Sequence, residues 1–238
     1  ILAALTSLLG GEALAEEIRY ALVFGNNIGN INELPLQYAE DDAQRFAEVL
    51  VRHGGVDPGN VTLLKDASAD QVLKSLERLN HRIESEAGPT DQTLLFVYYS
   101  GHADQNALHM GNSELALSDL HDAVKASSAN IELLVVDACR SGALLRLKGG
   151  TIIEPFEIRL RNDGMAILTS SSENEDAQES ERLKGGVFTH HLIGGLKGAA
   201  DTSGDARVSL YEVYQYTFAQ TLQETTAAPV LQHPKYDF

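Results

Sequence analysis

TLLFVYYSG occupies residues 93–101 and is apolar over most of its length, without alternation between apolar and polar side chains. Runs of this kind are typical of strands buried on both faces, because alternation appears only where one face of a sheet meets water. Four other runs have the same character: RYALVFG (19–25), VTLL (61–64), IELLVVDA (131–138) and MAILTSS (165–171). Helical patterns lie between them, at 39–55, 69–83 and 117–128. Strands and helices in alternation predict an α/β fold, with a mostly parallel central sheet and helices on both faces.

The composition is that of a globular protein with a strongly acidic surface. The chain has 238 residues, of which 43% are hydrophobic and 22% charged, and its formal net charge is -16. No tract rich in Pro or Gly divides it, so we expect a single domain over residues 16–238. The negative charge disfavours nucleic acid and anionic lipid as partners and attracts cations.

The first residues resemble a processed targeting segment. ILAALTSLLGGEALAEE (1–17) is an apolar stretch followed by small residues, which is typical of the apolar part and cleavage site of a signal peptide. We therefore interpret residues 1–15 as a signal-peptide remnant and expect export to a periplasm or out of the cell; an amphipathic helix lying on the domain is the alternative. No other apolar run approaches the roughly 20 residues of a membrane span, so no membrane contact is expected of the mature form.

The only cysteine, Cys139, follows the run 131–138, and His102 follows the run 93–101. A single cysteine excludes an intramolecular disulfide, so Cys139 is either a small buried side chain or a reactive thiol. Parallel strands end at one edge of their sheet, and adjacent strand ends would lie about 5 to 10 Å apart. There His102 would activate the Cys139 thiol, and the backbone N–H groups of Ala103 and Cys139 are candidates for an oxyanion hole.

Four stretches in this order resemble the caspase-like cysteine peptidases, the clan of caspases, metacaspases and bacterial orthocaspases: YALVFGNN (20–27), LQYAEDDAQRFAEVL (36–50), FVYYSGHAD (96–104) and VVDACRSGA (135–143). The resemblance implies the three-layer caspase-like (haemoglobinase) fold and a cysteine endopeptidase that needs no cofactor for its chemistry. Cys139 would be the nucleophile, His102 the general base and then acid, and the N–H groups of Ala103 and Cys139 the oxyanion hole. The family usually has glycine where this chain has Ala103, whose methyl group would crowd the site.

The resemblance also implies a substrate preference. In metacaspases, an acidic residue two positions before the cysteine and another in the first helix line a pocket for a basic side chain; the matching residues are Asp137 and Asp42. Two carboxylates suit arginine or lysine, which predicts a peptide or protein substrate cleaved after Arg or Lys. Asp41 is the alternative to Asp42, and a solvated helix face is an alternative role for Asp42.

Residues 201–212, DTSGDARVSLYE, fit a twelve-residue calcium loop. The side chains of Asp201, Ser203, Asp205 and Glu212 and the carbonyl of Arg207 would be its ligands. The sixth position, normally glycine, is Ala206. The alternative needs no metal, because Ser209 and Glu212 also form the S-x-x-E pattern of a helix capping box.

A catalytically silent caspase-fold domain that binds a partner or senses calcium is the alternative to an enzyme. We expect a monomer, as is general among metacaspases.

Overall fold

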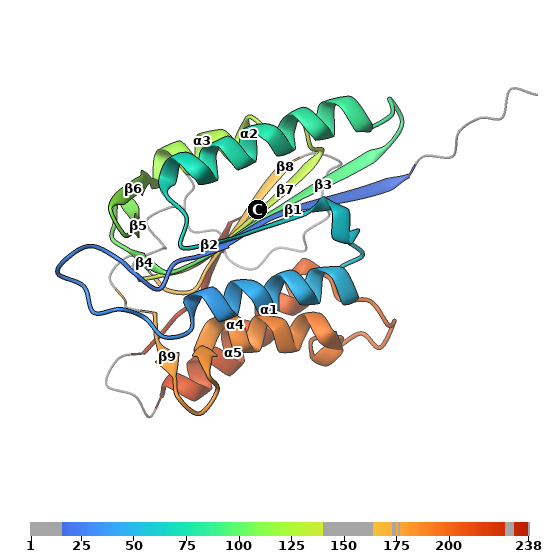
Figure 1. Cartoon of the computed structure of the whole chain (residues 1–238). Coiled ribbons are helices and arrows are strands. Elements are labelled where there is room, and N and C mark those ends of the chain that lie inside the picture. The colour runs from blue at the N-terminus through green and yellow to red at the C-terminus, as the bar shows by residue number, and fades with distance from the viewer. Residues whose placement is uncertain (1–15, 140–163, 173–174, 176, 227–230, 238) are drawn as a thin grey trace, which may run out of the picture.

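The computed structural model describes residues 16–139, 164–172, 175, 177–226 and 231–237. At its centre lies a six-stranded sheet, shown in Figure 1. Across this sheet the strands follow the order β11 (Lys235–Asp237), β8 (Gly164–Thr169), β7 (Ile131–Asp137), β3 (Gln92–Ser100), β1 (Glu17–Gly25) and β2 (Val61–Lys65). All neighbouring strands pair in parallel except β11, which runs antiparallel to β8. The predicted mostly parallel sheet is confirmed.

Helices cover both faces of this sheet (Figure 1). On one face lie α2 (Ala69–Glu86) and α3 (Leu117–Lys125), and on the other lie α1 (Ala39–Arg52), α4 (Val187–Gly194) and α5 (Leu210–Thr225). Successive side chains of β1 point into the two hydrophobic cores in turn. Tyr20, Leu22 and Phe24 pack in one core, and Ala21 and Val23 pack in the other. Burial on both faces is the reason why the strand sequences do not alternate, and the predicted three-layer fold is confirmed.

Local sequence signals set the ends of several helices. At the start of α2, the Ser68 hydroxyl accepts the N–H of Gln71, whose side chain accepts the N–H of Ser68. This capping box satisfies amide groups that the first turn leaves without partners. Helix α1 ends at Arg52, and Gly55 follows with a φ of 65°, a conformation that glycine adopts without strain. The helix thus ends three residues before the predicted pattern at 39–55 does, just ahead of the glycine pair 54–55.

Shorter elements complete the fold. A three-stranded antiparallel sheet comprises β4 (His102–Ala103), β5 (Ala107–Met110) and β6 (Ser113–Ala116), and lies where β3 ends. The other short elements are β9 (Glu179–Ser180), which pairs with β10 (Gly185–Gly186), and the single turns η1 (Pro58–Asn60) and η3 (Gly195–Ala199). The sequence predicted none of these strands, because two to four residues are too few to show a periodicity.

The predicted signal-peptide remnant, residues 1–15, lies outside the described residues, so export stays a prediction. Within the described part of the chain, no helix is long and apolar enough to cross a membrane.

Candidate active site

The register of two central strands brings His102 and Cys139 to the same level of the sheet. Strands β3 and β7 are parallel neighbours in which Ser100 pairs with Asp137, and each of the two site residues follows two positions later. The N–H of Gly101 donates to the carbonyl of Asp137 at 3.1 Å, so the two chains still lie side by side just beyond the strands. Cys139 is partly exposed. The predicted neighbourhood of the two strands is confirmed, whereas direct contact between sulfur and imidazole stays a prediction.

The imidazole of His102 lies in a narrow space with a carboxylate on one side. A Cβ atom added to Gly29 would lie 2.6 Å from Cδ2 of His102, so only glycine permits this packing. Nδ1 of His102 lies 3.8 Å from Oε1 of Glu33, and the side chain is 13% exposed. Nε2 is buried and hydrogen-bonds to no group among the described residues. The ring therefore has one nitrogen beside a carboxylate and the other without a hydrogen bond to any described group.

Tyr99 lies beneath this site. Its hydroxyl donates to the carbonyl of His102 at 2.9 Å, with the carbonyl of His109 at 3.3 Å. Burial raises the pKa of Tyr99 well above its usual value, and the nearby charges of Glu33 and Cys139 raise it further. The phenol therefore stays protonated and holds the backbone of His102 in place as a donor.

This packing predicts that Gly101→Ala will destabilise the domain. A Cβ at residue 101 would lie 2.2 Å from the Tyr99 hydroxyl and 3.0 Å from the carbonyl oxygen of Asn26. Overpacking of this kind typically costs about 1–3 kcal/mol, which denaturant unfolding would measure. Gly194→Ala in α4 is the matched control, because its Cβ would meet Tyr216 at an ordinary 3.7 Å and should stabilise the helix by about 0.5–1 kcal/mol. Equal stability of the two variants would contradict this account.

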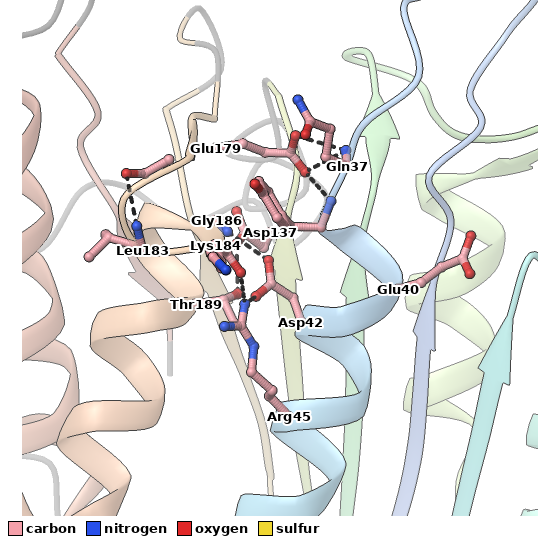
Figure 2. A network of polar contacts seen from close by, with 12 residues as sticks. Gln37, Glu40, Asp42, Arg45, Asp137, Glu179, Leu183, Lys184, Gly186 and Thr189 are labelled. Atoms are coloured by element: carbon pink, nitrogen blue, oxygen red, sulfur yellow. Dashed lines mark hydrogen bonds and ion pairs between the residues drawn. The ribbon is translucent and has the colours of Figure 1, made fainter.

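The predicted pocket residues Asp42 and Asp137 lie together between α1 and β7, as Figure 2 shows. Burial and then the charge of Asp137 raise the pKa of Asp42 to about 7. Burial also raises the pKa of Asp137, although Thr189 and Ser170 hydrogen-bond to its carboxylate. Asp42 is 1% exposed, whereas Asp41 points to solvent, so Asp42 is the carboxylate that faces Asp137.

Groups of the chain itself already bind both carboxylates (Figure 2). Asp42 forms an ion pair with Arg45 through one oxygen, and its other oxygen accepts the N–H of Gly186 at 2.7 Å. Asp137 accepts a hydrogen bond from the Thr189 hydroxyl at 2.6 Å. The structure thus shows a buried acidic pair, one member of which, Asp42, binds a guanidinium. Whether a substrate side chain reaches it stays a prediction.

Residue 186 must be glycine, because the backbone there packs directly against this acidic pair. A Cβ on Gly186 would lie 2.6 Å from Oδ2 of Asp137 and 3.2 Å from Oδ2 of Asp42. Three residues of this cluster were not predicted from the sequence: Arg45, Gly186 and Thr189. The sequence has one signal for this contact, the glycine pair 185–186 directly before the apolar start of α4. Two glycines allow the backbone to lie close to the side chains of another element.

A third carboxylate, that of Glu179, lies near the same pair (Figure 2). It accepts the N–H groups of Gln37 at 3.0 Å and Tyr38 at 2.8 Å, where α1 begins. Its charge is among the causes of the raised pKa of Asp137. Among the described residues of this cluster, the carboxylates of Asp42, Asp137 and Glu179 outnumber the guanidinium of Arg45, so their ionised forms give it an excess of negative charge.

The predicted calcium loop is closed by its own hydrogen bonds. The carboxylate of Asp201 accepts the N–H groups of Gly204 at 2.7 Å and Ala206 at 3.0 Å, and Ala206 has the left-handed φ of 61° that its position in the loop requires.

The other predicted ligands in this loop also have partners. Asp205 accepts the N–H of Arg207 at 2.8 Å, the Ser203 hydroxyl donates to Asp201 at 3.3 Å, and Glu212 forms the capping box of α5 with Ser209. Among the described residues, no group of three or more His, Cys, Asp or Glu side chains is arranged to hold a metal ion. The capping box is confirmed, and calcium binding stays a prediction.

The comparisons with known proteins agree with this fold. The model of the peptidase C14 caspase domain matches residues 18–231. The chain belongs to the caspase domain family. This caspase domain is similar in structure to caspase-1 from Spodoptera frugiperda, with 18% sequence identity, a TM-score of 0.67, and coverage of 94% of this chain and 87% of that one. A protein from Geobacter sulfurreducens has 16% identity and a TM-score of 0.64, with 92% of each chain covered. Among curated proteins, no sequence matches this one.

Proposed function

We propose that this caspase domain is a cysteine endopeptidase in which Cys139 and His102 form the catalytic dyad. The observation that carries the proposal is the register of β3 and β7, which brings both residues to the same level at the carboxyl end of the sheet. Active sites of parallel α/β sheets form at that end. Membership of a cysteine peptidase family and the partial exposure of Cys139 support it further.

The chemistry follows from the groups at this edge. His102 takes the thiol proton, and the Cys139 thiolate adds to the carbonyl carbon of the scissile peptide bond. The N–H groups of Ala103 and Cys139 stabilise the resulting oxyanion. The protonated imidazole then gives its proton to the leaving amine, and a water molecule, deprotonated by His102, hydrolyses the thioester and restores the thiol.

We propose that the residue before the cleaved bond is Arg or Lys. Asp137 lies two residues before Cys139, and Asp42 lies against it. The ion pair between Asp42 and Arg45 supports this preference, because it shows that a guanidinium suits this carboxylate. Glu179 nearby adds a further negative charge. A basic substrate side chain is therefore attracted to the cluster, and an acidic one is repelled.

Fluorogenic peptides that differ only in the residue before the reporter group test the proposal. We expect hydrolysis after Arg and Lys, at least about tenfold slower hydrolysis after a neutral residue, and none after Asp, since a like charge at a buried site costs several kcal/mol. Alkylation of the single thiol with iodoacetamide should abolish the activity. Hydrolysis of none of these peptides would favour a catalytically silent domain, and a preference for Asp would contradict the pocket.

A further inference from the structure

The loop between β1 and α1 places Glu33 between two histidines. Oε1 of Glu33 lies 2.8 Å from Nδ1 of His109 and 3.8 Å from Nδ1 of His102. Its other oxygen accepts the N–H of Asn30 at 2.6 Å. One carboxylate oxygen therefore faces both imidazoles, and the shorter of the two distances is to the histidine outside the proposed dyad.

The strand pairing fixes this arrangement. His102 in β4 and His109 in β5 are directly opposite residues of an antiparallel pair, whose side chains project on the same face. The loop itself is tied to the same small sheet, since the N–H of Gly111 donates to the carbonyl of Ile28 at 2.9 Å and the amide of Asn30 donates to Glu114 at 2.9 Å. The carboxylate of Glu33 is thus held beside the ring of His102 by contacts outside the dyad.

The surroundings keep Glu33 ionised. Burial by itself raises the pKa of Glu33, but the hydrogen bonds from Asn30 and His109 and the nearby imidazoles outweigh it, so the pKa lies below its usual value. The side chain of His109 is 8% exposed, and its Nε2 lies 3.7 Å from Asp104. His109 therefore lies between two carboxylates and serves as a fixed support for Glu33.

We infer that Glu33 is a positioning residue that stabilises the protonated form of His102 through Nδ1. The inference rests on the proposed function and adds a third member to the proposed dyad. When His102 takes the proton of Cys139, its ring becomes a cation 3.8 Å from a carboxylate, a distance at which opposite charges form an ion pair. Nε2, which no described group engages, remains to exchange the proton with sulfur.

The charged and titratable groups near His102 come from several elements: Glu33 from the loop, His109 from β5, Asp104 after β4, Tyr99 from β3 and Cys139 after β7. Among the described residues, Glu33 alone places a carboxylate within 4 Å of the imidazole of His102 itself. A purely structural role, in which Glu33 only anchors the loop through Asn30 and His109, is the competing explanation.

Glu33→Gln separates the two roles, because glutamine keeps the size and the acceptor oxygen but removes the charge. The pH dependence of iodoacetamide alkylation reports on the ionisation of Cys139 alone, since the chain has one cysteine. We expect the midpoint of alkylation to rise by about one pH unit and kcat to fall about tenfold with KM unchanged, because one pKa unit corresponds to a tenfold change in the ionised fraction. Glu114→Gln is the matched control, because Glu114 binds Asn30 in the same loop.

The outcomes are distinct. Alkylation midpoints that coincide in wild type, Glu33→Gln and Glu114→Gln would overturn the inference, and so would a lower melting temperature of Glu33→Gln with an unmoved midpoint. Alkylation requires no turnover, so it also separates this inference from the proposed function. If the wild type hydrolyses no peptide, the proposed function fails, while a raised midpoint in Glu33→Gln would still support the action of Glu33 on His102.

Discussion

Replacing Cys139 by alanine is expected to lower kcat/KM toward the preferred peptide by roughly four orders of magnitude or more, because the sequence contains no second thiol to form the covalent intermediate. Cys139 lies two residues beyond the end of β7 and is partly exposed, so the loss of its sulfur should leave the fold intact. Hydrolysis of the fluorogenic peptide by wild type and variant at equal concentration measures the effect. Residual activity close to that of the wild type would refute the dyad and leave the proposed reaction without a nucleophile.

The companion variant His102→Ala tests the second half of the dyad. Loss of the general base should lower kcat about 10²- to 10⁴-fold, and alkylation of Cys139 at neutral pH should slow as well, because the thiol loses the partner that accepts its proton. His53→Ala is the matched control, since His53 is an exposed residue at the end of α1. Unchanged alkylation in His102→Ala would show that the two side chains are not coupled.

The parallel strands at the centre of the sheet were predictable from the sequence, because strands buried on both faces have continuous apolar sequences. The runs at 93–101 and 131–138 agree with β3 and β7 to within one residue at each end. The edge strand β11 has no such pattern, since it pairs with β8, a distant part of the chain, and β9 and β10 are too short at two residues each to show one. Sheet order likewise depends on packing between elements, which no local run encodes.

The site residues also divide into those that a local sequence motif predicts and those that distant contacts bring to the site. Residues next to the motifs, such as Asp137 beside Cys139, could be found from the matched stretches. Residues that reach the site from elsewhere could not: Gly186 contacts Asp42 across 144 positions, and Glu33 contacts His109 across 76. Such partners lie on separate loops and become visible only when the chain has folded.

Replacing Asp137 by asparagine is expected to lower kcat/KM for Arg and Lys peptides by about 30-fold or more, which corresponds to about 2 kcal/mol, as is found when a buried charge loses its partner. Arg45 already pairs with Asp42, so without Asp137 a basic substrate side chain would enter a site whose nearest carboxylate is neutralised. Asparagine keeps an acceptor oxygen for the Thr189 hydroxyl, so the local packing should persist. Peptides with a neutral residue before the cleaved bond should lose far less, and the ratio of the two activities is the measurement.

Asp41→Asn is the matched control for Asp137→Asn, because it removes the same charge from an exposed position of α1 next to Asp42. If both variants kept the wild-type preference for basic residues, the pocket would not involve Asp137. A changed preference in Asp41→Asn alone would instead assign the pocket to the exposed carboxylate.

The raised pKa of Asp42 gives this pocket a pH dependence of definite sign. Because the pKa lies at about 7, Asp42 becomes protonated as the pH falls through that value, and the attraction for a basic side chain weakens. The ratio of kcat/KM for Arg peptides to that for neutral peptides should therefore fall toward low pH, and using the ratio cancels the titration of the dyad, which both peptides share. In Asp137→Asn the fall should move to lower pH, because the charge that helps to raise the pKa of Asp42 is gone.

The stability of the domain should depend on the same titration. A carboxyl group whose pKa is higher in the folded than in the unfolded chain binds its proton more tightly when folded. Its contribution to the free energy of unfolding is therefore largest below the unfolded value of 3.8 and is lost as the pH rises to about 7. Across that window the wild type should lose more stability than Asp137→Asn, because the variant lacks both the raised pKa of Asp137 itself and the charge that helps to raise the pKa of Asp42. Equal losses in chemical denaturation would contradict the raised pKa of both carboxyl groups.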